Sequence, residues 1–106
     1  MSEADFLDTV VHLAKLRGWL VYHARPAQVR PGVWRTPYTG DRGFPDLVLA
    51  HQTHGIIFAE LKTQTGRLSV HQKAWLDTLQ KAGREAYCWR PDQLPLIAQR
   101  LSGDPV

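Results

Sequence analysis

Two stretches decide the fold of this chain: GFPDLVLA at residues 43–50 and GIIFAELK at residues 55–62. Each contains an apolar run with the length and composition of a strand. The linker at residues 51–55, HQTHG, is short enough to join the two runs as a hairpin. We therefore predict two neighbouring antiparallel strands.

The register of this hairpin determines whether its acidic residues meet. If Ala50 pairs with Ile56, Asp46 lies directly opposite Glu60, with Cβ atoms about 4.5–5.5 Å apart. Lys62 follows Glu60 by two residues and therefore joins the same face of the strand. Because two facing carboxylates repel each other unless a cation lies between them, the pair indicates a metal site.

Two alternatives remain open for this hairpin. A slip of one residue would move Asp46 to the opposite face, so only this register or an even shift of it preserves the pair. Pro-Asp also often starts a strand, and Glu-x-Lys is common on a solvated strand face. The order of the two motifs, each attached to an apolar strand, favours the functional interpretation.

The remaining pattern predicts an α/β fold with a mixed sheet of about four strands flanked by helices. Helices are expected from Ser2 to Arg17 and from Ser69 to Ala82, where Ser69 and Gln72 form a capping box. Strands are expected at residues 19–24 and 85–89, and Asp92 should cap a short final helix. The element order is αβββαβα, and a right-handed crossover makes the last strand parallel to its neighbour.

The composition indicates one globular domain over residues 1–106, with 43% hydrophobic residues and four tryptophans. No apolar run is long enough to cross a membrane, and the N-terminus lacks the regions of a signal peptide. The only cysteine, Cys88, excludes an intramolecular disulfide, fits a cytoplasmic location and should be a buried structural thiol. We expect His51 and His54 to be exposed, because neither has a third metal ligand nearby.

The positive charge of the chain, +3 overall, is concentrated in a segment rich in proline and glycine. We expect residues 25–45 to form an irregular functional loop, since structureless connections of this length are unusual in compact domains. Basic side chains interleave there with Trp34, Tyr38 and Phe44, which suits phosphate contacts and stacking on unpaired bases. Alternatively, Trp34 and Phe44 cover the sheet. The candidate nucleic-acid contacts are Arg25, Arg30, Arg35, Arg42 and Arg67.

Two polar residues begin the inward-facing stripes of the predicted helices. Glu3 either interacts with the dipole of the first helix or reaches the active centre from its end. Gln72 is explained by capping alone, yet it is also well placed to contact a catalytic lysine or a phosphate. We favour the second role for Gln72.

With these residues assembled, the chain resembles the PD-(D/E)xK nuclease superfamily. Within it, the chain is similar to the virus-type replication-repair nuclease (VRR-NUC) domain of small standalone phage and bacterial proteins. Four motifs carry the likeness. They are Glu3 of the first helix, Gly-x-Pro-Asp at residues 43–46, Glu-x-Lys at residues 60–62, and Gln-x-x-Trp at Gln72 and Trp75.

The resemblance implies a restriction-endonuclease-like core and a Mg²⁺- or Mn²⁺-dependent endonuclease that acts on DNA. Asp46, Glu60 and the Leu61 carbonyl would hold the metal, with Glu3 completing the shell directly or through water. Lys62 would orient or deprotonate the attacking water or stabilise negative charge, and Gln72 would hold Lys62 or a phosphate oxygen.

Standalone relatives resemble homodimeric four-way-junction resolvases. We therefore expect branched or junction DNA as substrate, a role in DNA repair, a second copy as partner and no membrane. Cleavage of plain duplex DNA or RNA remains open, as does a non-catalytic, basic DNA-binding module.

Overall fold

A computed structural model describes residues 1–24, 27–35 and 38–103 of the chain. The elements in chain order are α1 (Glu3–Leu16), β1 (Leu20–His23), β2 (Ala27–Arg30), β3 (Val33–Arg35), β4 (Leu47–His51), β5 (Gly55–Leu61), α2 (Val70–Lys81), β6 (Glu85–Trp89), a 3₁₀ turn (Pro91–Gln93) and α3 (Leu94–Leu101).

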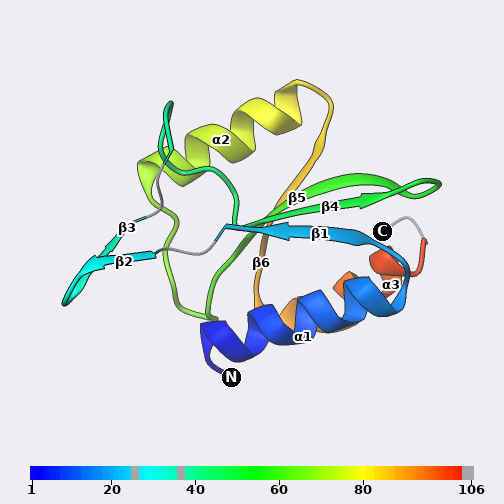
Figure 1. Ribbon diagram of the computed structural model, residues 1–106. Coiled ribbons are helices and arrows are strands. Elements are labelled where there is room, and N and C mark those ends of the chain that lie inside the picture. Colours follow the sequence, from blue (N-terminus) through cyan, green and yellow to red (C-terminus); the bar gives the residue numbers. More distant parts are fainter. Residues whose placement is uncertain (25–26, 36–37, 104–106) are drawn as a thin grey trace.

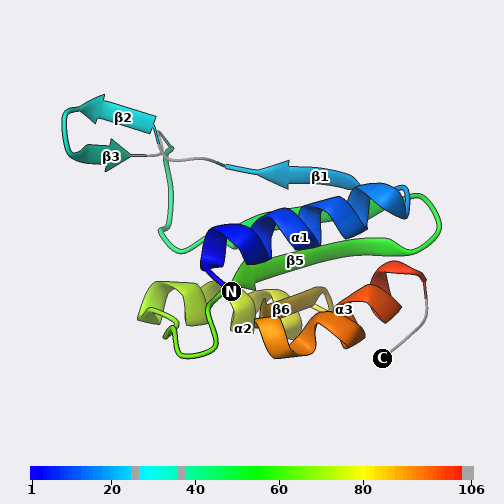
Figure 2. The same ribbon diagram turned by 90° about the horizontal axis from the view of Figure 1, so that it is seen from below.

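Four strands form a mixed sheet in the order β1-β4-β5-β6. The β1–β4 and β4–β5 pairs are antiparallel, and the β5–β6 pair is parallel. Helices α1 and α3 lie on one side of this sheet and α2 lies on the other (Figure 1; Figure 2). The predicted fold class and the parallel crossover before β6 are confirmed.

The segment expected to be an irregular loop contains a second sheet. Strands β2 and β3 pair with each other to form a two-stranded sheet, so the predicted element order lacked two strands. Pro31 and Gly32 form the turn between the paired residues Arg30 and Val33, and Gly32 has a φ of +77°. Proline and glycine suit the central positions of a tight turn, so Pro31 and Gly32 mark a hairpin within the segment expected to be irregular.

The core lies between α1, α3 and one face of the sheet. Residues facing this core alternate along β4 and β5, as the strand period requires. The fully buried side chains include Phe6 and Val10 of α1, Leu47 and Leu49 of β4, Ile57 and Ala59 of β5, and Ile97 and Leu101 of α3. Trp19, just before β1, ties this core to α3 because its indole N–H donates to the Leu101 carbonyl at 2.8 Å.

The hairpin register predicted from the sequence is confirmed. Ala50 pairs with Ile56 and Leu47 pairs with Ala59, so the next position along β4 places Asp46 level with Glu60. Both residues therefore lie on the sheet face opposite α1.

The ends of the helices follow the predicted capping pattern, except at the last helix. Ser2 caps α1, and Ser69 and Gln72 form the capping box of α2. The expectation that Asp92 caps the final helix is wrong. Asp92 lies inside the 3₁₀ turn, and the Gln93 side chain accepts the Arg90 backbone N–H at 2.8 Å instead.

The two turn histidines are half-buried rather than exposed. The rings of His51 and His54 stack with centroids 4.1 Å apart, and the His51 ring lies 5.2 Å from Trp19. Arg100 holds this end of the hairpin by donating to the His54 carbonyl at 2.7 Å. The expected exposure of the two histidines was wrong because the sequence does not show that this turn packs against Trp19 and α3.

None of the helices in the described residues has the length and apolar character needed to span a bilayer.

Candidate active site

Polar groups from three elements meet at one edge of the main sheet. Asp46 immediately precedes β4, and Glu60 is the penultimate residue of β5. Because β4 and β5 are antiparallel, the start of one lies beside the end of the other. Lys62 follows β5, and Gln72 lies in the first turn of α2.

Asp46, which is half-buried, and Glu60, which is buried, form a pair of facing carboxyl groups. The Asp46 Oδ2 atom accepts the Leu61 backbone N–H at 2.9 Å, which fixes its side chain against the end of β5. Glu60 is only 3% exposed. Burial and repulsion by Asp46 raise the pKa of Glu60 to about 8.

Two further side chains contact one oxygen of Glu60. The Lys62 Nζ atom lies 3.7 Å from Glu60 Oε2, and the Gln72 Nε2 group donates to the same oxygen at 3.0 Å. Gln72 was expected to contact the lysine or a phosphate, but in the structure its partner is Glu60. Its Oε1 atom also accepts the Ser69 N–H at 2.9 Å, so capping and site contact occur together.

The other Glu60 oxygen, Oε1, is buried without a hydrogen-bond partner among the described residues. Buried polar atoms normally have a partner, so this oxygen is a strong candidate for a ligand contact. No group of three or more His, Cys, Asp or Glu side chains suitable for a metal occurs in the described part of the chain. The donor set is thus two carboxylates, which suits a hard cation such as Mg²⁺ that keeps several waters.

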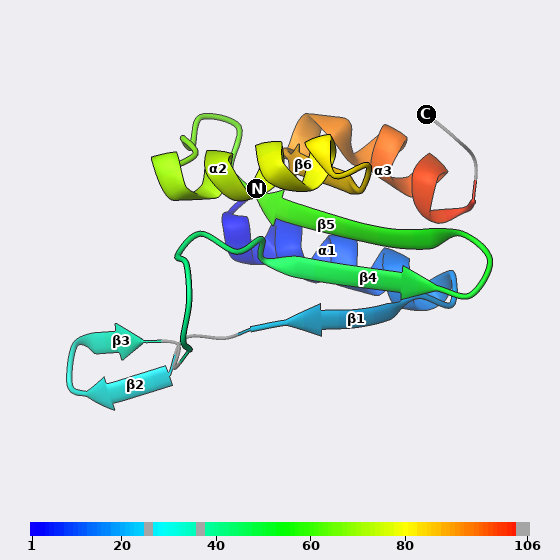
Figure 3. The ribbon, with the colours of Figure 1, turned by 90° about the horizontal axis from the view of Figure 1, so that it is seen from above.

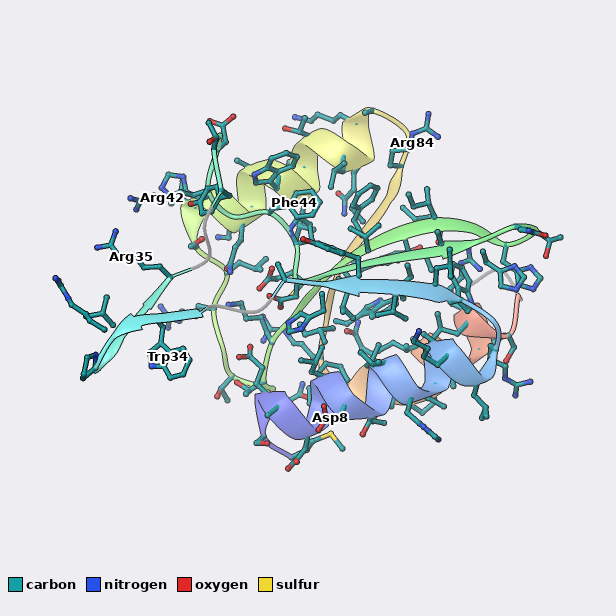
Figure 4. All side chains as sticks on the ribbon, in the orientation of Figure 1. Asp8, Trp34, Arg35, Arg42, Phe44 and Arg84 are labelled. Carbon is teal, nitrogen blue, oxygen red and sulfur yellow. The ribbon has the colours of Figure 1, made fainter. Side chains whose placement is uncertain are left out.

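The loop that carries Asp46 is seated directly on the start of α2. Gly43 has a φ of +91°, and a Cβ atom there would lie 2.4 Å from the His71 carbonyl carbon. Phe44 packs edge-on against Trp75 of α2 and Phe58 of β5, with ring centroids 5.0 and 6.1 Å apart (Figure 4). Phe44 therefore covers part of the sheet, which is one of the two roles considered for it. The glycine of the motif allows the close approach of the loop backbone to α2.

Two further metal ligands were predicted, namely Glu3 and the Leu61 carbonyl oxygen. Glu3 is exposed in the first turn of α1, which lies beside the C-terminal end of β5 in all three ribbon views (Figures 1 and 2; Figure 3). Within residues 1–24, 27–35 and 38–103, no hydrogen bond or ion pair joins Glu3 to Asp46, Glu60 or Lys62. Leu61 ends β5 beside Glu60, and the role of its carbonyl stays a prediction.

The candidate DNA-contacting arginines surround this edge rather than entering it. Arg25 lies outside the described residues. Arg30 and Arg35 are exposed on the β2–β3 hairpin, while Arg42 and Arg67 are exposed in the loops before β4 and α2. Figure 4 shows Arg35 and Arg42 pointing away from the core.

The family model described as the VRR-NUC domain matches residues 21–91, about two thirds of the chain. The chain belongs to the VRR-NUC family. The match includes Asp46, Glu60, Lys62 and Gln72 but starts after the helix that carries Glu3.

A solved structure described as a VRR_NUC domain protein shares the fold of this chain. The TM-score is 0.66, with 20% sequence identity, over 98% of this chain and 91% of the other. The search of curated proteins gave no match.

Sequence reasoning missed one residue that shapes the VRR-NUC site. Arg90 follows β6, and its Nη1 group donates to the carbonyls of Thr63 and Gly66, each at 2.7 Å. These bonds hold the loop that leaves Lys62. The only signal in the sequence was an arginine directly after the last predicted strand.

Cys88 lies opposite Glu60 in the β5–β6 register and is half-buried. Burial raises the pKa of its thiol, so the neutral form is favoured. Cys88 is thus less buried than expected, and its structural role stays a prediction.

We expect Gly43→Ala to destabilise this VRR-NUC fold more than Gly40→Ala. Both glycines have positive φ, but a Cβ at Gly40 would meet no atom within 4 Å, whereas a Cβ at Gly43 would strike the α2 backbone. The strained backbone alone costs about 1–2 kcal/mol. Urea unfolding of both variants measures the difference. Equal losses would show that the Gly43 loop does not need its close seat on α2.

We expect the metal-free protein to lose stability as the pH rises from about 4.5, the ordinary pKa of Glu60, through about 8. The folded state favours protonated Glu60, so ionisation in this range destabilises it. Urea unfolding in EDTA across this range should show the decline in wild type and not in Glu60→Gln. Glu85→Gln is the control, because Arg100 lowers the pKa of Glu85 and its effect falls on the acid side. A wild-type profile that is flat between these pH values contradicts the expectation.

Proposed function

We propose that this VRR-NUC protein is a Mg²⁺- or Mn²⁺-dependent endonuclease that hydrolyses phosphodiester bonds in branched DNA. One observation carries the proposal: Glu60 is buried and faces Asp46, with its Oε1 atom free of hydrogen bonds among the described residues. Two facing carboxyl groups, one of them buried, are destabilising unless a proton or a cation offsets the negative charge.

Asp46 and Glu60 would hold the cation, with the Leu61 carbonyl as a third ligand and Glu3 reaching it directly or through water. When bound, such a cation lowers the pKa of a coordinated water and offsets negative charge on the phosphate. Glu60 must give up its proton to serve as a ligand, so cation binding should be coupled to proton release.

Gln72 and Lys62 prepare Glu60 for this role. Their contacts converge on Oε2, which leaves Oε1 for the cation. The Lys62 side chain is 17% exposed, so its Nζ atom can reach a substrate phosphate from the end of β5. There it would stabilise negative charge or take a proton from the attacking water.

DNA is favoured as the substrate because exposed arginines lie on the loops around the carboxyl pair. Clustered arginines bind phosphates through paired N–H donors. The preference for branched over plain duplex DNA, and for DNA over RNA, rests on the family resemblance and is decided by experiment.

A second copy of the chain is the partner that we propose for the uncovered part of the sheet. Figure 3 shows that none of the helices in the described residues covers β1 and β4 on the face opposite α1. Leu20, Tyr22 and Ile56 project there and are 74%, 62% and 40% exposed. Their cross-strand rows contain no charged residue, so this surface complements itself rather than DNA or a charged partner.

We expect Glu60→Gln and Lys62→Met each to lower Mg²⁺-dependent cleavage by at least about 100-fold while changing DNA affinity by less than about threefold. Matched substrates, namely a four-way junction, a flap, a linear duplex and RNA, measure activity and selectivity together. Asp77→Asn, on the exposed side of α2, removes the same charge as Glu60→Gln and should cleave normally.

Full activity in both site variants would overturn the proposed mechanism, and equal cleavage of all substrates would overturn structure selectivity. Mg²⁺ should also raise the melting temperature of wild type but not of Glu60→Gln, which tests the site without cleavage.

We expect Tyr22→Glu to shift a dimer to monomers, because it places two charges within the apolar contact. Sedimentation velocity measures the shift. Leu96→Glu is the matched control, since Leu96 is a similarly exposed apolar residue on α3. A wild-type protein that is monomeric at all concentrations, or that dissociates only with Leu96→Glu, would contradict the assigned face.

A further inference from the structure

The β2–β3 hairpin stands clear of the helices and of the main sheet in all three ribbon views (Figures 1, 2 and 3). It forms a two-stranded sheet of its own. A hairpin of this size gains little stability by itself, so folding of the domain does not explain its presence.

The two faces of the hairpin carry different chemistry. Arg30 pairs with Val33, and Arg35 lies two residues beyond Val33, so both arginines share one face. Trp34 lies between Val33 and Arg35 in the sequence and therefore points to the other face. Figure 4 shows Trp34 and Arg35 on opposite sides of β3.

Trp34 differs from the other tryptophans in its exposure. Its side chain is 62% exposed, whereas Trp19 and Trp89 are 2% and 5% exposed and Trp75 is half-buried against Phe44. The alternative that Trp34 covers the sheet is therefore wrong. An exposed indole on a projecting strand is suited to contact with a partner.

The described segments that precede and follow the hairpin lie close to the active site. The chain leaves the main sheet at the end of β1, which the antiparallel pairing places at the same edge as Asp46 and Glu60. It returns through a loop anchored on α2, where the Trp75 indole N–H donates to the Asp41 carbonyl at 3.3 Å.

We propose that the β2–β3 hairpin is a DNA-binding arm with divided roles, a proposal that rests on the nuclease function proposed above. Arg30 and Arg35 bind backbone phosphates on one face and hold any DNA. Trp34 stacks on an unpaired base on the other face, so it favours DNA in which the duplex is interrupted. Intact duplex keeps its bases stacked inside and offers Trp34 no partner.

The test is binding in EDTA, where cleavage does not occur, measured by fluorescence anisotropy on an intact duplex and on the same duplex with a short single-stranded gap. Trp34→Ala should weaken binding to the gapped DNA roughly 5- to 150-fold, the range of one base–aromatic stack. It should change duplex binding less than about twofold. Trp34→Phe should restore most of the preference, because phenylalanine keeps an aromatic face.

The double variant Arg30→Gln/Arg35→Gln should weaken binding to both DNAs and reduce the dependence of log K on log salt concentration by about 2, one for each phosphate contact. Arg84→Gln is the matched control. Arg84 is exposed in the turn between α2 and β6, away from the hairpin (Figure 4), and its loss should alter neither binding nor salt dependence measurably.

Equal weakening of both DNAs by Trp34→Ala, or no weakening of either, would overturn the stacking role. A loss of DNA affinity in Arg84→Gln that is half as large as the loss in the double variant, or larger, would overturn the phosphate role. These outcomes are separate from failure of the proposed nuclease, which would appear as wild-type protein that discriminates between the two DNAs yet cuts neither in Mg²⁺.

Discussion

The close approach of Asp46 and Glu60 is the constraint on which the candidate site depends. The β4–β5 register brings the two carboxyl groups level, and burial of Glu60 prevents water from screening their repulsion. The fold balances this repulsion locally through the Leu61 N–H on Asp46 and through Lys62 and Gln72 on Glu60. One carboxylate oxygen is nevertheless left without a partner in the described chain.

The surroundings of the pair are held by contacts that also build the fold. Gly43 allows the loop before β4 to lie directly on the α2 backbone, and Phe44 fills the space between α2 and β5. On the other side, Arg90 closes the loop that follows Lys62. The positions of Asp46 and Lys62 are thus set by the backbone contact at Gly43, by the Phe44 ring and by the Arg90 side chain.

The sequence was most informative where a local rule fixes the geometry. Strand period and linker length predicted the observed β4–β5 register but left a slip of one residue open, whereas Ser69 with Gln72 was sufficient for the start of α2. The sequence was least informative where the outcome depends on contacts between distant segments. Three such contacts were not predicted. They are the packing of His51 and His54 on Trp19, the hydrogen bond from Gln72 to Glu60, and the bonds made by Arg90. Each joins residues that no local sequence pattern connects. The β2–β3 hairpin was missed because its strands are short and its turn residues also suit an irregular loop.

The two polar atoms of the Gln72 amide make different contacts. Oε1 accepts the Ser69 N–H and so caps the first turn of α2, and Nε2 donates to Glu60. Gln72 itself belongs to the first turn of α2, so its contacts with the Ser69 N–H and with Glu60 both depend on the position of that turn. Fraying of the first turn of α2 would therefore release the carboxylate at the same moment. A partly folded chain, such as one still emerging during synthesis, would hold its acidic pair without this restraint, so the arrangement of Asp46 and Glu60 is complete only when the start of the helix has formed.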